Sequence, residues 1–160
     1  MRKQIVQATS LTSTSPSSQE LNVADLATVL VTSEASDFPV ENAFDDRRGP
    51  GGSCWAAVEP GEQTLTVAFD VPQTLRRIVL EIEEREVERT QELSVALSED
   101  GGQTYRELLR QEYTFSPSGA TFEREEWSVP ARKVTHVQVR IKPDKGNRPC
   151  LATLTTLALQ

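Results

Sequence analysis

The chain has 160 residues and a net charge of −7, with 37% hydrophobic and 26% charged residues. This composition predicts a globular protein of one domain, and the acidic balance excludes typical nucleic-acid binding, which needs a basic face. No apolar run approaches the roughly 20 residues needed for a membrane span.

The first 20 residues are rich in Ser, Thr and Gln, and they predict a flexible lead-in or an edge strand. Residues 21–160 are predicted to form the single folded domain. Because the N-terminus lacks the continuous apolar centre of a signal peptide, a cytoplasmic location is expected. An extracellular module trimmed of its leader has the same appearance, so both locations stay open.

Spaced apolar residues after position 20 predict one or two helical turns, and Thr28–Thr32 (TVLVT) is typical of a buried strand. From residue 63 onward, apolar residues alternate with period two. The predicted strands are 63–70, 75–83, 91–98, 105–113, 121–129, 134–141 and 150–159. Turns are predicted at Val71–Gln73 and at 130–133, and a hairpin at Asp100–Gly102.

The charged segment 81–92 suits either a helix or a strand end followed by a loop. Alternating strands on both sides favour the loop, with the acidic run Glu81–Glu88 as a solvated face. About eight short strands without helical spacers predict an all-β, antiparallel β-sandwich. A parallel sheet would require crossover segments of a dozen residues or more.

The reactive side chains are few. Cys54, Cys150 and the single His136 cannot complete the four ligands of a structural zinc site. The cysteines are predicted to be buried free thiols, or one disulfide in an oxidising compartment. His136 lies in a predicted strand without a nucleophile motif around it, so no enzymatic activity is expected.

Six segments between residues 33 and 157 occur in a characteristic order: PVENAFDD, SCW, FDVPQTLRRIVLEI, LSVALSEDGGQTYREL, ARKVTHVQVRI and GNRPCLATL. This order resembles the discoidin, or coagulation factor 5/8 type C, domain. That family overlaps the family 32 carbohydrate-binding modules among the galactose-binding-like proteins. The resemblance implies a jelly-roll β-sandwich of about eight strands, which agrees with the strand count from the alternating pattern.

The resemblance is clearest in Pro39–Trp55. The family pattern Asn-Ala-x-Asp-Gly…Ser/Thr-x-Trp is matched by Asn42, Ala43, Asp45, Ser53 and Trp55, with Asp46 in place of the glycine. Many carbohydrate-binding members hold a structural calcium ion here, which implies Asp45, Asp46 and Ser53 as calcium ligands.

The last predicted strand lacks the carboxylate that the family supplies, so the expected calcium shell is incomplete. Alternatively, Asp45 caps a turn. The resemblance also implies that Cys54 and Cys150 lie close together, where a disulfide would fasten the loop. No other cofactor is expected.

The resemblance further implies a non-catalytic module that binds a carbohydrate through loops at one end of the sandwich. The loops 45–52, 84–91 and 143–149 offer candidate ligand-binding residues, namely Arg47, Arg48, Arg89, Asn147 and Arg148. None of these loops contains an aromatic residue, and Trp55 and Trp127 are predicted to belong to the core. The alternative is an intracellular protein–protein interaction domain of the same superfamily.

Overall fold

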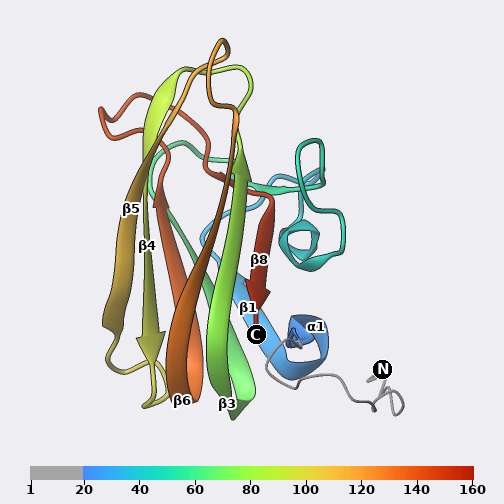
Figure 1. Cartoon of the computed structure of the whole chain (residues 1–160), viewed down its shortest axis with the longest axis vertical. Coiled ribbons are helices and arrows are strands. Elements are labelled where there is room, and N and C mark those ends of the chain that lie inside the picture. The colour runs from blue at the N-terminus through green and yellow to red at the C-terminus, as the bar shows by residue number, and fades with distance from the viewer. Residues whose placement is uncertain (1–19) are drawn as a thin grey trace.

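The computed structural model describes residues 20–160 (Figure 1). The predicted N-terminal segment 1–20 therefore lies outside the described residues, apart from Glu20. The elements are α1 (Val23–Leu26), β1 (Ala27–Val31), the 3-10 helix η2 (Val40–Phe44), β2 (Trp55–Ala56), β3 (Gln63–Glu83), β4 (Arg89–Ser98), β5 (Arg106–Phe115), β6 (Phe122–Lys142), β7 (Thr153–Leu154) and β8 (Thr156–Leu159).

The long strands β3 and β6 organise the molecule. They pair with each other in antiparallel register from Gln63 opposite Ile141 to Glu83 opposite Phe122. β1 pairs with the first part of β3 and β8 with its last part, while β4 and β5 extend the sheet from the second part of β6. Figure 1 shows both long strands folding over at the lower end, so that each contributes to both layers of an antiparallel β-sandwich. The predicted fold class is confirmed.

Two predicted turns prove to be irregularities within continuous strands. The β3–β6 register shifts between Ala68 and Arg77, which includes the predicted turn at Val71–Gln73. On β6, the predicted bend at 130–133 contains Lys133 with a φ of 57°. Bulges bend a strand without ending it, which explains why four predicted strands merge into two.

The ends of the chain also differ from the prediction. The predicted last strand, 150–159, is divided at Thr155 because β7 pairs with β2 whereas β8 pairs with β3. β1 is not a buried strand, since it lies at the sheet edge and Leu30 is 55% exposed. The predicted helical turns are confirmed as α1, which begins after the N-cap residue Asn22.

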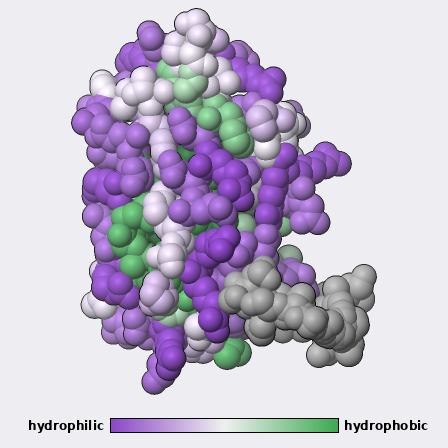
Figure 2. Space-filling view, viewed as in Figure 1, coloured by the Kyte–Doolittle hydropathy of each residue, from purple (hydrophilic) through white to green (hydrophobic). Residues whose placement is uncertain are grey.

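One contiguous hydrophobic core lies between the layers. The alternating residues of β3, β4 and β6 supply most of it, as the period-two pattern predicted. The visible surface is largely hydrophilic (Figure 2). Among the described residues, no helix is long and apolar enough to span a membrane.

Trp55 is a fully buried core residue of β2, and its indole N–H donates a hydrogen bond to the Ser33 carbonyl at 3.1 Å. Trp127 is partly buried and packs against the same core. The prediction that both tryptophans belong to the core is therefore confirmed for Trp55 and confirmed in part for Trp127.

We expect Trp55→Ala to lower the free energy of unfolding by about 3–5 kcal/mol, because it leaves a large cavity and an unpaired carbonyl. Trp127→Ala is the matched control and should cost less. Denaturant unfolding of both variants checks this expectation. An equal or larger loss of unfolding free energy in Trp127→Ala would contradict the deeper burial of Trp55.

Candidate functional site

Two of the three predicted binding loops lie side by side. The loop after β3 and the loop after β6 meet at the upper end of the sandwich in Figure 1. Arg148 Nη2 donates to the Glu88 carbonyl, and the Lys145 N–H donates to the Thr90 carbonyl at 2.7 Å. These two predicted binding loops therefore lie at the same end of the fold, as a binding site formed by both of them requires.

A groove of about 470 Å³ opens at this end, between the loop before β3 and the loop after β6. We call it the apical groove. It is lined by Pro60, Gly61, Glu62, Lys142, Pro143, Asp144, Asn147, Arg148 and Pro149. Its volume lies in the range of small-ligand sites, and three proline rings provide apolar wall beside the polar groups. Sequence reasoning predicted Asn147 and Arg148 here but missed the prolines.

Asp144 holds the two predicted ligand-binding residues in place. It is 5% exposed, and its carboxylate accepts hydrogen bonds from the Arg148 backbone N–H at 3.0 Å and from Arg148 Nε at 3.1 Å. The Asn147 N–H donates to the Asp144 carbonyl at 3.0 Å. Asn147 itself has a φ of 65°, a conformation that asparagine tolerates better than most residues. The groove-lining turn is thus preorganised.

The charges of Asp144 and Arg148 also largely neutralise each other. Hydrogen bonds from the Arg148 side chain and backbone lower the pKa of Asp144 to about 2, and Asp144 raises the pKa of Arg148. Asp144 is therefore ionised at neutral pH and unsuited to act as a general acid. The guanidinium contributes hydrogen-bond donors to the groove but little uncompensated charge.

A second groove, of about 660 Å³, adjoins the same turn on its other side. Asp144 and Arg148 line both grooves. The second groove includes the ion pair between Lys145 Nζ and Glu112, at 2.6 Å. Arg148 therefore lies between two neighbouring hollows of the apical surface.

The structure places Arg89 inside the protein instead of on a loop. Its side chain is 1% exposed, forms an ion pair with Glu84 at 3.0 Å and donates to the Leu151 carbonyl at 2.8 Å. β4 begins at Arg89, earlier than predicted, so Arg89 shares the inward face with Gln91, Leu93 and Val95. Extending the period-two pattern back from Leu93 would have revealed this orientation. Arg89 therefore links the start of β4 to the segment before β7, and although it borders the second groove its side chain is almost fully buried.

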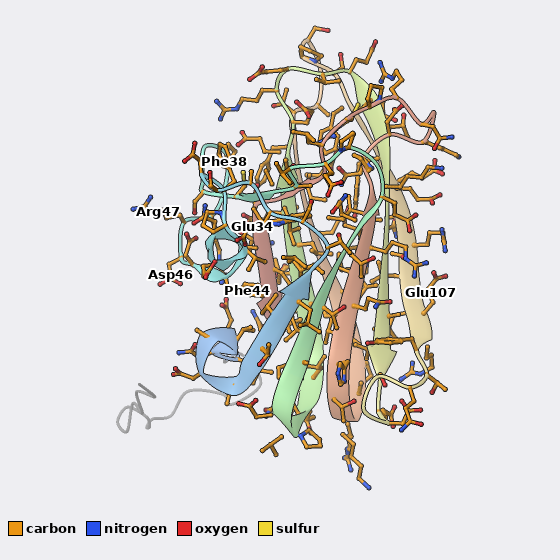
Figure 3. The ribbon with its side chains drawn as sticks, turned by 180° about the vertical axis from the view of Figure 1, so that it is seen from behind. Glu34, Phe38, Phe44, Asp46, Arg47 and Glu107 are labelled. Carbon is orange, nitrogen blue, oxygen red and sulfur yellow. The ribbon has the colours of Figure 1, made fainter. Side chains whose placement is uncertain are left out.

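The third predicted loop, 45–52, lies on the flank of the sandwich. Its backbone reaches the end of β3, because the Gly49 N–H donates to Glu81 Oε1 at 2.8 Å and the Gly51 N–H to Glu83 Oε1 at 3.0 Å. Figure 3 shows Arg47 pointing away from the body of the domain. Arg47 and Arg48 therefore line neither of the two grooves described above.

The residues of this loop do not fit the calcium site that the resemblance implied. Asp45 Oδ2 accepts a hydrogen bond from the Ser53 hydroxyl at 2.5 Å, and Asp45 Oδ1 accepts one from the Arg47 N–H at 2.9 Å. Both carboxylate oxygens thus have protein donors, in the turn-capping arrangement that was the alternative. Among the described residues, no group of three or more His, Cys, Asp or Glu is arranged to hold a metal.

Cys54 and Cys150 are free thiols, as one of the two predictions had it, and the alternative disulfide is not formed. The β2–β7 register explains their separation, because Trp55 lies opposite Leu154 and Ala56 opposite Thr153. Cys54 and Cys150 therefore flank opposite ends of this short ladder. Both thiols are half-buried, and burial raises the pKa of Cys54.

Glu81 was misjudged from the sequence, and the exposed Phe38 was missed. Glu81 was assigned to a solvated acidic face, but it is 3% exposed and hydrogen-bonded beneath the 45–52 loop. Phe38 directly precedes the segment Pro39–Trp55 and is 45% exposed on the flank (Figure 3). The alternation of β3 places Glu81 on the face opposite Leu80 and Ile82, so its burial follows from the loop that covers it and not from the strand pattern.

We expect Asp144→Asn to destabilise the protein at neutral pH, because the amide cannot replace the charged acceptor. The pKa of Asp144 is lowered in the folded state, so its stabilising contribution is full above the unfolded pKa of about 3.9 and disappears as the pH falls towards 2. Thermal unfolding between pH 7 and pH 2 should show the wild type and variant converging in acid. Asp37→Asn, at an exposed position, is the control. A difference in Tm between the wild type and Asp144→Asn that persists at pH 2 would contradict the stabilising role of the Asp144 charge.

No family model matches the sequence, and no curated protein sequence matches it. The fold nevertheless matches solved structures. The family 32 module of NanJ from Clostridium perfringens, in complex with galactose, has a TM-score of 0.58 and 15% identity, and the match covers 88% of this chain and 96% of that one.

Chitosan-binding module 1 from the chitosanase/glucanase of Paenibacillus sp. IK-5 has a TM-score of 0.60 and 22% identity, over 88% of this chain and 98% of that one. The family 32 module of AlyQ, in complex with 4,5-unsaturated mannuronic acid, has a TM-score of 0.59 and 19% identity, over 85% and 95%. At these identities the likeness establishes the fold alone. The chain therefore has the β-sandwich fold of the family 32 carbohydrate-binding modules, as the resemblance implied.

Proposed function

We propose that this protein is a non-catalytic carbohydrate-binding module that holds a sugar in the apical groove. The observation that carries the proposal is the preorganised turn, in which Asp144 fixes Asn147 and Arg148 against a wall of prolines. Fixed polar groups beside an apolar wall suit a sugar ring, which has hydroxyls at its rim and C–H groups on its faces.

The two polar residues supply complementary hydrogen bonds. The Asn147 side-chain amide both donates and accepts, whereas the Arg148 guanidinium only donates. A sugar hydroxyl can act in either sense, so it matches both groups. No aromatic residue lines the apical groove, and the proposal therefore implies modest affinity, which depends on these hydrogen bonds more than on ring stacking.

The charge of the groove favours uncharged or amino sugars over uronates. Arg148 is neutralised by Asp144, and the chain as a whole carries a charge of −7. A negatively charged sugar would gain little from Arg148 and would be repelled at longer range. Related folds bind galactose, chitosan and an unsaturated mannuronic acid, so the class of sugar must follow from the groove of each chain.

The arrangement of titratable groups supports a non-catalytic role. His136 lies at the other end of the sandwich, opposite Ser98 in the β4–β6 register and close to Gly102 in the β4–β5 turn. Asp144 is held ionised by Arg148. Neither residue is placed to work as an acid–base pair in the apical groove.

One observation favours the alternative, a protein–protein interaction domain. The exposed apolar residues Phe38, Val58 and Leu151 lie on adjacent segments of the flank, joined where the Ala56 N–H donates to the Phe38 carbonyl and the Ala57 N–H to the Ala152 carbonyl. Self-association through this face would appear as a dimer in light scattering. Phe38→Ala would abolish that dimer and leave sugar binding unchanged.

Binding is tested first on a glycan array, then by calorimetry with galactose, chitosan oligosaccharides and mannuronate oligosaccharides. We expect Asn147→Gly to weaken binding of the best ligand by roughly tenfold, since it removes the amide but keeps the positive φ. Arg106→Ala, at the start of β5 near the opposite end, is the control. An absence of signal on all sugars, or equal affinity in Asn147→Gly, would refute the proposal.

A further inference from the structure

The flank loop covers a buried carboxylate. Glu81 is 3% exposed and joins four parts of the fold. Its Oε1 accepts hydrogen bonds from the Gly49 N–H at 2.8 Å and the Thr156 hydroxyl at 3.1 Å, and its Oε2 accepts from Arg124 Nε at 3.1 Å. The loop, β8 and β6 are thereby fastened to β3 through one charged group, which needs compensating positive charge because it is buried.

Arg48 provides positive charge on the loop side. Its guanidinium forms a two-pronged ion pair with the carboxylate of Glu20, in which Nη1 donates to Oε2 at 2.6 Å and Nη2 donates to Oε1. The hydrogen bond to Glu20 and the charges of Glu20, Glu81 and Asp46 raise the pKa of Arg48, and Arg48 lowers the pKa of Glu20. One half-buried guanidinium is thus ion-paired with Glu20, and the nearby negative charges of Glu81 and Asp46 also favour its charged form.

The loop backbone is shaped to bring its own donors to these carboxylates. Gly49 and Gly51 have φ values of 80° and 85°, which favour glycine. At Gly52, an added Cβ would lie 2.4 Å from the Arg47 carbonyl oxygen. The tight winding turns the N–H groups of Gly49 and Gly51 towards Glu81 and Glu83. Oxygen atoms that could ligate an ion are thus used as hydrogen-bond acceptors.

We propose that the Arg48 guanidinium takes the place of a structural calcium ion in this flank loop. The positive charge at this loop is then a side chain of the protein itself, and the stability of the protein does not depend on divalent ions. Removal of the guanidinium leaves the Glu20 carboxylate without its ion-pair partner and takes a nearby positive charge from Asp46 and Glu81, although Glu81 keeps its ion pair with Arg124. Because no three acidic residues among the described ones are arranged to hold a metal, calcium is not expected to replace the lost cation. The inference is independent of what the apical groove binds.

Thermal unfolding in EDTA and in millimolar CaCl₂ tests the proposal. We expect the wild type to have the same Tm in both. Arg48→Met, which keeps much of the side-chain bulk, should have a lower Tm than the wild type by the same amount in EDTA and in CaCl₂. Arg47→Met is the matched control, because Arg47 is the exposed neighbour on the same loop, and it should behave like the wild type.

Two results would overturn the proposal: a wild-type Tm that rises in CaCl₂, or an Arg48→Met variant as stable as the wild type. If Arg48→Met fails to fold, the wild-type comparison still decides whether calcium is needed. Glu20→Gln then provides the second variant, which should lose stability in EDTA and in CaCl₂ equally. A calcium-dependent Tm in Glu20→Gln would also count against the proposal.

Discussion

The antiparallel pairing of β3 with β6 is the interaction on which the rest of the structure depends. Because both strands fold over at their bulges, one continuous ladder supplies the centre of both layers. Every other main strand attaches to one of these two, directly or through β4. The strand ends then determine where the loops go: β3 begins and ends beside β6, and the apical groove opens between the loops that precede β3 and follow β6.

Carboxylates that accept backbone N–H groups fix several loops of this acidic protein. Asp144 holds the groove-lining turn, Glu81 holds the flank loop, and Asp100 accepts the N–H groups of Gln103 and Thr104 in the β4–β5 turn. A charged acceptor strengthens such bonds and lets a short side chain define a loop conformation. Asp144 and Glu81 also pair with arginine side chains, Arg148 and Arg124, which helps a chain with many carboxylates to form ordered loops.

The proposed sugar site and the proposed internal cation lie in different parts of the fold. The apical turn is fixed by its own Asp144–Arg148 pair. The flank loop is instead attached to the last part of β3 through Glu81, and to Glu20, before α1, through Arg48. Arg89, the first residue of β4, donates to the Leu151 carbonyl and so links the start of β4 to the segment before β7. Arginines that look equivalent in sequence thus have three roles: one lines a groove, one is buried as a tie, and one neutralises a loop.

The sequence by itself determined the all-β class, because alternating apolar residues require strands with one buried face, and the turn-forming residues separate them. It also identified the loop after β6 and its residues Asn147 and Arg148, since a polar segment between two strands must lie at the surface. Only the tertiary structure decided that Glu81 is buried, that Cys54 and Cys150 stay apart, and that Arg48 faces Glu20. Each of these depends on which distant segments become neighbours, and local pattern carries no information about register between strands far apart in the chain.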